Sequence, residues 1–252
     1  MCGRFTLTNP NQDLLVQFTL RDMPALEPRY NIAPTQPVAA VRVAPALAAL
    51  PPVAAKEAAL RSEGREGSAR ELVLLHWGLV PFWAKDPQIG SRLINARSET
   101  VAEKPAFREA FRRRRCLVLA DGFYEWQKQG GTKQPFCVRL RDGRPFAFAG
   151  LWEHWQGTDA VVESCTLLTT DPNELMRPLH NRMPVIIDPG DYELWLDVGV
   201  RQPDVLQSLL RPYPAEEMEA YPVSRRVNSP DNDDPQCVEP LPHGEGTPFS
   251  GF

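Results

Sequence analysis

The sequence predicts a single α+β domain with a mainly antiparallel, barrel-like β core and short peripheral helices. Apolar runs of strand length follow one another through the second half of the chain, separated by turn pairs at Asp121-Gly122, Gly130-Gly131 and Asp142-Gly143. Strands and helices do not alternate regularly and no segment repeats, which favours an α+β arrangement. With 252 residues, of which 42% are hydrophobic, the chain can bury a sizeable core.

The first elements are a strand, a short helix and a second strand. "MCGRFTLT" enters a strand almost at once, and a short helix is expected in "TLTNPNQDLLVQF". Pro10 suits the first turn of that helix, and Leu14, Leu15 and Phe18 share one face. "RYNIAPTQPVAAVRV" is interpreted as a proline-punctuated loop that leads into a strand. Residues 44–70, rich in Ala, Pro, Gly, Arg and Glu, are predicted to be a surface insertion.

The remaining elements are mostly strands. After "ELVLLHWGLVPFW", a short helix is expected over 105–111, with the basic residues 112–115 as its solvated end. Strands are predicted in "CLVLA", "GFYEWQK", "PFCVRL", "PFAFAGLWEHW", "ESCTLLTT" and "MPVII". Short helices are predicted in "PNELMRPLH", "DYELWLD" and "PDVLQSLL". One domain over 1–240 with a flexible tail over 241–252 is the expected organisation.

Composition excludes several classes of protein. The five cysteines, Cys2, Cys116, Cys137, Cys165 and Cys237, form no CxxC pair, which argues against a disulfide framework and a zinc site. We expect no cofactor and no metal. The chain has neither a run of eighteen apolar residues nor a secretory pattern at its start, so we expect no membrane association and a cytoplasmic location, with nucleoid association in a bacterium. The net charge of −4 speaks against a protein that coats nucleic acid through overall charge, although a basic groove is compatible with it.

Cys2 is the first candidate for chemistry. If Met1 is removed, Cys2 carries an α-amine with a pKa of about 7.7–8.0 beside a thiol with a pKa of about 8.5. An amine and a thiol on adjacent carbons react preferentially with an aldehyde: the amine forms an imine, and the sulfur closes onto its carbon to give a thiazolidine. This capture needs a nearby acid/base group. The alternative is that a cysteine occupies position two by chance.

Candidate partners of Cys2 lie far away in sequence. Asn95 and Arg97 occupy alternate positions of "INARSET", so in an extended segment they share one face. Glu125 lies in an aromatic strand, where burial would raise its pKa toward a value useful for proton transfer, unless it is a solvent-facing strand residue. His180 precedes an apolar strand and is suited to proton transfer, unless it is a helix cap or a packed residue.

Three arginines and two tryptophans are candidates for binding a nucleic acid strand. Arg4, Arg97 and Arg182 each adjoin one of the polar groups above, and Arg suits bidentate phosphate binding. Trp83 and Trp126 could stack on unpaired bases. For any single one of these residues, a surface ion pair or a core position is the alternative. Structural roles are assigned to His76 and His154, while His243 lies in the tail.

Several of these motifs occur together in one known family. "MCGRF", "RYNIAPTQ", "WGLVPFWAKD", "INARSETV", "AFREAF", "CLVLADGFYEWQ", "FAFAGLWE", "LLTT" and "LHNRMPVII" follow one another as in the SOS-response-associated peptidase (SRAP) family, which this chain resembles over about residues 1–240. The resemblance implies recognition of abasic sites in single-stranded DNA, with DNA-crosslinking, lyase-type activity and self-processing cysteine peptidase activity in DNA repair. It also implies autocatalytic removal of Met1, which exposes the Cys2 amine.

The resemblance also implies roles for individual residues. Cys2 would be the nucleophile that forms the thiazolidine, Asn95 would position the reacting groups, and Glu125 would transfer protons. His180 would assist opening of the sugar ring and reversal of the crosslink. Phosphates would be held by Arg4, Arg97 and Arg182, and bases would pack on Trp83 and Trp126. We expect a monomer, and replication-fork proteins are a candidate class of further partner.

Three other functions are consistent with parts of the sequence. A class II glutamine amidotransferase also begins with Cys-Gly, although the similarity stops after these residues. A non-covalent single-strand DNA-binding module would leave Cys2 without a role and would bind without lesion preference. A peptidase that acts on other proteins would need more than the cleavage of Met1.

Overall fold

The computed structural model describes residues 2–44, 70–158 and 160–242. Nearly all of the predicted insertion and tail, together with Met1 and His243, lie outside these residues. The helices and strands are β1 (Phe5–Leu7), α1 (Asp13–Gln17), β2 (Arg29–Ile32), β3 (Pro37–Val43), β4 (Arg70–Trp77), η1 (Pro87–Arg92), β5 (Asn95–Arg97), α4 (Arg108–Arg113), β6 (Arg115–Ala120), β7 (Gly122–Gln129), β8 (Thr132–Leu140), β9 (Phe146–Gln156), β10 (Val161–Thr170), β11 (Met183–Pro184), β12 (Ile186–Ile187), η2 (Pro189–Asp191), α5 (Tyr192–Leu196), α6 (Pro203–Gln207), η3 (Ala215–Glu217), β13 (Met218–Pro222), η4 (Arg225–Asn228) and η5 (Pro235–Cys237).

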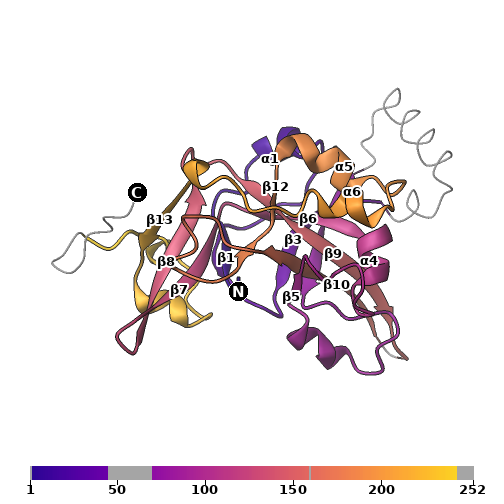
Figure 1. The fold of residues 1–252 in the computed structure, drawn as a ribbon, viewed down its shortest axis with the longest axis horizontal. Coiled ribbons are helices and arrows are strands. Elements are labelled where there is room, and N and C mark those ends of the chain that lie inside the picture. The colour runs from indigo at the N-terminus through magenta and orange to yellow at the C-terminus, as the bar shows by residue number, and fades with distance from the viewer. Residues whose placement is uncertain (1, 45–69, 159, 243–252) are drawn as a thin grey trace.

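Five strands close into a barrel. The larger sheet runs in the order β11-β10-β4-β3-β6-β9-β12, and an additional pairing of β10 with β9 closes β10, β4, β3, β6 and β9 into a ring (Figure 1). Most pairs are antiparallel, but β10 runs parallel to β4 and to β5. The predicted α+β fold with a barrel-like, mainly antiparallel core is therefore confirmed, whereas the parallel pairs are a feature that the strand pattern did not predict.

A second, five-stranded sheet contains the amino-terminal strand. Its order is β13-β8-β7-β1-β2, and each of its pairings is antiparallel. Phe5 lies opposite Phe123 of β7 on one side and Ile32 of β2 on the other. The residues just before Phe5 are therefore held at the middle of a sheet rather than at a loose chain end.

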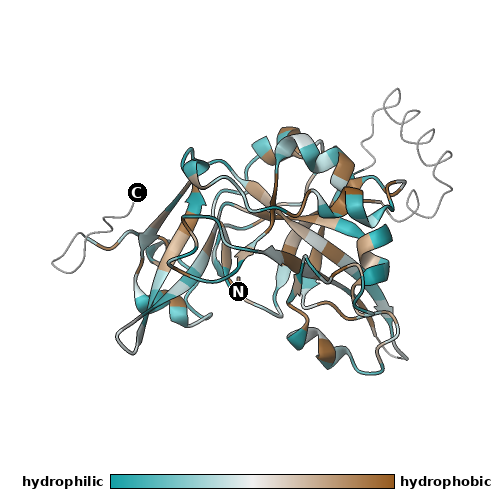
Figure 2. Ribbon diagram, in the orientation of Figure 1, coloured by the Kyte–Doolittle hydropathy of each residue, from teal (hydrophilic) through white to brown (hydrophobic). Residues whose placement is uncertain are grey.

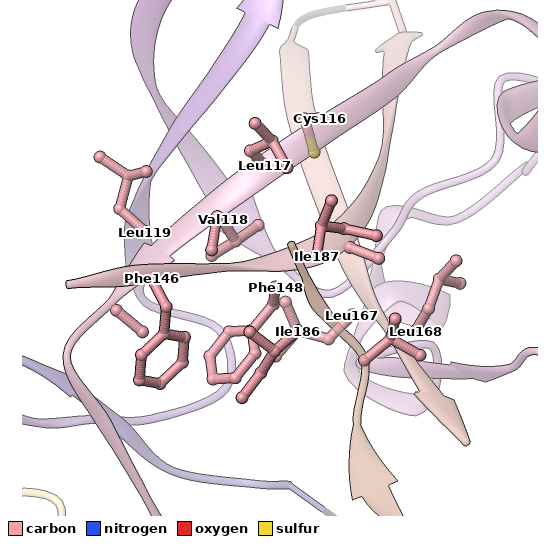
Figure 3. Packing of buried hydrophobic residues seen from close by; sticks show 14 of the residues in the cluster. Cys116, Leu117, Val118, Leu119, Phe146, Phe148, Leu167, Leu168, Ile186 and Ile187 are labelled. Carbon is pink, nitrogen blue, oxygen red and sulfur yellow. The ribbon is translucent and has the colours of Figure 1, made fainter. Parts of the chain in front are cut away.

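The core is continuous across the barrel strands. All six residues of β6 are buried, which fits a strand that is covered on both faces. Figure 3 shows the side chains of β6 next to those of β9, β10 and β12, from Leu117 and Phe148 to Leu167 and Ile186. Figure 2 shows many hydrophobic residues on the central strands and a mixture of hydrophilic and hydrophobic residues on the short helices.

Two glycines fix the end of β4. Gly78 has a φ of 141°, and a Cβ there would lie 2.7 Å from the carbonyl oxygen of Gly90. In the reverse direction, a Cβ on Gly90 would lie 2.5 Å from the carbonyl oxygen of Gly78. Only glycine allows this close approach of two backbones. The contact brings η1 against the end of β4 and so sets the path of the chain into β5.

Arg115 corrects the prediction that residues 112–115 form a solvated helix end. Its side chain is buried and donates hydrogen bonds to the carbonyl oxygens of Phe111, Arg112, Trp195, Asp197 and Val200. Burial lowers its pKa to about 10. Because the acceptors include the last carbonyls of α4 and α5, the guanidinium joins the ends of two helices to the barrel.

Other local differences follow from tertiary contacts. "PNELMRPLH" forms consecutive turns instead of the predicted helix. Asn173 Oδ1 accepts from Met176 N as at a helix start, but Pro178 has no N–H with which to continue the helical hydrogen bonds. Arg29–Ile32, predicted as loop, is a strand because it pairs with β1. The predicted helix over 105–111 begins and ends slightly later, at Arg108–Arg113. Among the described residues, no helix has the length and apolar character needed to cross a membrane.

Candidate active site

Cys2 lies in the protein interior, immediately before β1. Its side chain is 0% exposed, and its Sγ lies 3.7 Å from the carbonyl oxygen of Arg4, to which it donates. Burial raises the pKa of the thiol well above its ordinary value, and the negative charge of Glu125 raises it further. The sulfur is therefore a protonated thiol at neutral pH, rather than a thiolate.

Asn95 reaches Cys2 from a distant part of the chain. β5 is held by its parallel pairing with β10, in which Asn95 lies opposite Leu167. The Nδ2 of Asn95 donates to the backbone carbonyl oxygen of Cys2 at 2.7 Å. Its Oδ1 is buried and accepts no hydrogen bond from the described residues. Asn95 therefore fixes the position of Cys2 and keeps an acceptor beside it.

Glu125 is buried beside the same cysteine. It lies in the middle of β7, is 2% exposed, and contributes to the raised pKa of Cys2. The solvent-facing alternative for this residue is therefore wrong. Burial raises the pKa of the Glu125 carboxyl, and this effect outweighs the opposing influence of the positive charge at the amino terminus. A carboxyl with a raised pKa is suited to accept and return a proton near neutrality.

His180 lies in the loop between β10 and β11. Its Nδ1 accepts a hydrogen bond from the backbone N–H of Arg182 at 3.0 Å. In the neutral ring the hydrogen therefore resides on Nε2. Burial lowers the pKa of His180, so the neutral ring is the main form at pH 7. The preceding turn is attached to β7, because Gln127 Nε2 donates to the carbonyl oxygen of Pro178 at 3.2 Å.

Cys2, Glu125 and His180 share one electrostatic environment. Burial is the largest cause of the pKa shift in each of them, and the charge of the chain's amino terminus is a further cause in all three. The hydrogen bond from Asn95 and the effect of Glu125 on the Cys2 pKa place these three residues together, while His180 is related to them through the charge of the amino terminus. Their roles in a reaction stay predictions.

The three arginines have different surroundings. Arg97 is exposed, and in the part of the chain that the structure describes its guanidinium has no hydrogen-bond or ion-pair partner. Arg182 donates to both carboxylate oxygens of Glu99, at 2.6 and 3.0 Å, and to Asp171. Arg4 donates to Asn31 Oδ1 and to the carbonyl oxygens of Val227 and Asn228. Of the three, Arg97 is thus the one whose guanidinium is free to take a phosphate without losing a bond.

The two tryptophans also differ. Trp83 is 49% exposed and follows Phe82, which is 57% exposed, on the loop that leads from β4 to η1. Trp126 is half-buried at the edge of the small cluster around Tyr124, and its Nε1 donates to Asn228 Oδ1 at 2.8 Å. Both rings present a surface to solvent, and the interaction with bases stays a prediction for each.

Sequence reasoning missed the residues that hold these groups. Glu99 pairs with Arg182. Its spacing of two residues from Arg97 and four from Asn95 could have indicated that it lies on the same face of an extended segment. Asn31 and Asp233 support Arg4 and β2, but no local pattern links positions some 200 residues apart. Their roles emerge only from the fold.

Other candidate sites carry less chemistry. Within the described ranges, no group of three or more His, Cys, Asp or Glu side chains could hold a metal ion. Two hollows of about 320 and 490 Å³ lie around Asp121, and none of the four candidate catalytic residues lines them. The Asp121 carboxylate already accepts from Thr6, Thr8 and Asn9, which identifies it as a structural residue.

The fold and the site together define a class of protein. Its members combine a small closed barrel with a second sheet, and at the junction of the two a cysteine at the second position is buried beside a glutamate carboxyl. Comparison with known families agrees with this description, because the sequence model of the SOS response associated peptidase (SRAP) family matches residues 1–230. The chain belongs to the SRAP family.

Named relatives and solved structures extend the comparison. The abasic site processing protein YoqW of Bacillus subtilis is 42% identical over 244 residues, which cover 95% of this chain and 99% of the relative. The abasic site processing protein HMCES of Gallus gallus is 35% identical over 205 residues, or 71% of this chain and 60% of the relative. A crystal structure of a Bacteroides thetaiotaomicron protein is similar with a TM-score of 0.64 and 32% identity, covering 68% of this chain and 77% of that one. A Bordetella bronchiseptica protein gives a TM-score of 0.68 at 25% identity, covering 88% and 100%.

Proposed function

We propose that this chain captures abasic sites in single-stranded DNA through a covalent bond to Cys2, after removal of Met1. The observation that carries the proposal is the burial of Cys2 beside Glu125, with the Cys2 carbonyl held by Asn95 at 2.7 Å. Relatives of 41–42% identity are named abasic site processing proteins, which supports the same class of DNA target. An abasic deoxyribose exists in part as an open-chain aldehyde, the partner that an aminothiol prefers.

In the chain that retains Met1 the thiol is protonated, which favours an order of steps in which the amine reacts first once Met1 is removed. The Cys2 amine attacks the aldehyde carbon, the adduct loses water, and an imine forms. The Sγ–H then adds across the C=N bond: sulfur bonds to carbon, and the proton passes from sulfur to nitrogen. Glu125 can carry that proton, because its raised pKa lets it accept a proton and release it again. The net reaction consumes one aldehyde and one aminothiol and yields one thiazolidine and one water.

We assign to His180 the step before capture. Opening of the closed sugar needs a proton at the ring oxygen and loss of the proton on the anomeric hydroxyl. The neutral His180 ring can donate through Nε2, whose hydrogen is fixed by the bond from Arg182 N to Nδ1. The same group can serve the reversal of the crosslink, since reversal passes through the same intermediates.

The surface residues supply a binding site for the strand. Arg97, whose guanidinium has no partner among the described residues, lies two positions from Asn95, and Phe82 and Trp83 offer exposed rings on the loop that precedes η1. Guanidinium groups on phosphates and aromatic rings on bases are the usual combination for a single strand. Arg182 is proposed as a further phosphate contact that would exchange present partners for the DNA, whereas Arg4 is proposed to keep its bonds to Asn31, Val227 and Asn228 and to attract phosphates through its charge.

The test is intact mass spectrometry and a denaturing gel of the full chain with an abasic oligonucleotide. We expect loss of Met1 and an adduct that survives detergent with the unmodified abasic strand. A borohydride-reduced abasic strand, which has no carbonyl, should give none. Cys2→Ala should abolish the adduct, while Cys137→Ala, which alters a buried thiol on β8, should not. An adduct with the reduced strand, or one that persists in Cys2→Ala, would contradict the proposal.

The same experiment separates the rival functions. A non-covalent single-strand binding module would shift the strand on a native gel and leave no adduct. A glutamine amidotransferase would release ammonia from glutamine. We expect none, because burial keeps the Cys2 thiol protonated, whereas attack on an amide needs a thiolate.

A further inference from the structure

The segment after β13 packs on the outer face of the five-stranded sheet. Val223, Val227 and Cys237 form a small buried cluster with Tyr124 of β7 and Cys137 of β8. Figure 1 shows this last part of the chain, in yellow, beside β7 and β8. The segment thus covers the face of β7 opposite to the one that carries Glu125, since successive strand residues face opposite sides.

Asp233 attaches this segment to β2. Its carboxylate accepts the backbone N–H groups of Tyr30, at 2.5 Å, and Asn31, at 2.8 Å, and pairs with the Arg29 side chain. Three donors from consecutive residues of one strand therefore converge on a single carboxylate. Such charge-assisted bonds are stronger than neutral ones, so this carboxylate holds the segment firmly against β2.

Asn31 continues the connection from β2 to β1. Its side chain is 0% exposed, and its Nδ2 donates to the carbonyl oxygens of Val227, Ser229 and Asn232 at 3.2, 2.9 and 2.7 Å. Its Oδ1 accepts from Arg4 Nη1 at 2.7 Å. The Asn31 carboxamide thus connects the last segment of the chain with a residue two positions from Cys2.

Arg4 completes the path to the cysteine. Its carbonyl oxygen accepts the Cys2 Sγ–H and the backbone N–H of Tyr124, the neighbour of Glu125. Its guanidinium also donates to the carbonyl oxygens of Val227 and Asn228. A shift of the segment would therefore move Arg4, and with it the sulfur, relative to Glu125.

We propose that Asp233 and Asn31 are positioning residues for Cys2, which act through Arg4 to hold the amino-terminal nucleophile against Asn95 and Glu125. The proposal rests on the proposed function for the reaction that it affects. A segment more than 220 residues from Cys2 would thus fix the geometry in which capture occurs. This geometry matters because small displacements of reacting groups lower the reaction rate by large factors. Neither residue touches the reacting atoms.

The chain offers a matched pair of variants for the test. Asp233→Ala and Asp234→Ala each remove one carboxylate from adjacent positions, but Asp234 bonds only within its own segment, to Arg226 and to Gln236 N. The first readout is the crosslinking rate at saturating abasic strand and the strand concentration at half saturation. In Asp233→Ala we expect the maximal crosslinking rate to fall at least about tenfold, while the strand concentration at half saturation changes by less than about threefold. In Asp234→Ala the maximal rate should stay within about twofold of the wild type.

The second readout needs no DNA. Alkylation of Cys2 by iodoacetamide, followed by peptide mass spectrometry, measures how firmly the sulfur is held in its buried position. We expect at least about tenfold faster alkylation in Asp233→Ala and in Asn31→Ala than in the wild type and Asp234→Ala. Asp233→Asn keeps one acceptor oxygen and should recover part of both effects.

A control separates positioning from general destabilisation. Leu206→Ala removes a buried side chain from α6, away from this connection, and should lower the melting temperature without changing either readout. Equal rates and equal alkylation in the Asp233 and Asp234 variants would overturn the proposal, as would the same effects in Leu206→Ala. If the wild type forms no adduct, the proposed function fails, while alkylation still decides whether Asp233 and Asn31 hold Cys2.

Discussion

Replacement of Glu125 by glutamine tests the proton-transfer role and the energetic cost of its burial together. Glu125→Gln keeps the shape of the side chain and removes its titration. General acid–base catalysis contributes about 10²–10⁴-fold, or about 2.7–5.5 kcal/mol, so we expect the crosslinking rate to fall by that factor. By comparison, Asn95→Ala removes one neutral hydrogen bond of 2.7 Å and should cost about 0.5–1.5 kcal/mol, or about 2–13-fold.

The same substitution should have the opposite effect on stability. The pKa of Glu125 is higher in the folded chain than in the unfolded one because burial disfavours its charge. Below the ordinary glutamate pKa of about 4.3 the carboxyl is neutral in both states, so it costs nothing there. As pH rises from about 4.3 to the folded-state pKa, the unfolded state has lost its proton while the folded state still holds it, so the free energy of unfolding falls over this range and stays lower above it. Glu125→Gln should therefore melt like the wild type at pH 4 and at a higher temperature than the wild type at pH 8.

The assay is the first-order appearance of adduct at saturating abasic strand on a denaturing gel, with thermal melting at the two pH values. Binding of the undamaged strand is the control, and it should change less than about threefold because the carboxyl is buried away from phosphates. A rate within about threefold of the wild type would remove Glu125 from the mechanism. A lower melting temperature at pH 8 would refute the account of its pKa.

Two further predictions concern arginines. Arg97→Ala should weaken binding of single-stranded DNA. It should also reduce the magnitude of the slope of log K against log salt concentration by about 0.7, the value for one phosphate contact, as measured by fluorescence titration at several salt concentrations. An unchanged slope in Arg97→Ala would contradict the proposed contact between Arg97 and a phosphate. Arg182→Ala should weaken binding with a smaller change in the slope, because Glu99 and Asp171 already neutralise its guanidinium. Arg115→Ala should lower the free energy of unfolding by about 3–5 kcal/mol in urea titrations, because several buried carbonyls lose their donor. Arg115→Lys should lose less, and a cost below about 1 kcal/mol in the alanine variant would show that the bonds to the helix ends contribute little.

Elements with local signals were predictable from the sequence. Turn residues at Asp121-Gly122, Gly130-Gly131 and Asp142-Gly143 fall at or beside the connections that separate β6, β7, β8 and β9. The apolar runs of these strands and the peripheral helices α5 and α6 were expected and are confirmed. Cys116, Cys137 and Cys165 lie in apolar runs and are buried, and Cys237 is buried as well, although no apolar run surrounds it.

Features that depend on distant contacts were not predictable. Arg29–Ile32 has a proline-rich neighbourhood, and it becomes a strand because β1 and the Asp233 carboxylate take up its backbone groups. Asn95 and Glu125 were singled out by residue type and setting, while the burial of Cys2 and the bond from Asn95 to its carbonyl required the fold. The surroundings of Arg182 and Arg4 likewise depend on partners far away in sequence.

The wide separation of the site residues also has a consequence during synthesis. Cys2 is synthesised before Asn95, Glu125 and His180, and Asp233 is synthesised after all four. At about 5–20 residues per second, roughly 10–50 s pass between the first and the last of them. Throughout that interval the nascent polypeptide contains Cys2 but lacks some of the residues that surround it in the folded chain. The site can therefore form only after the strands of the five-stranded sheet have been synthesised.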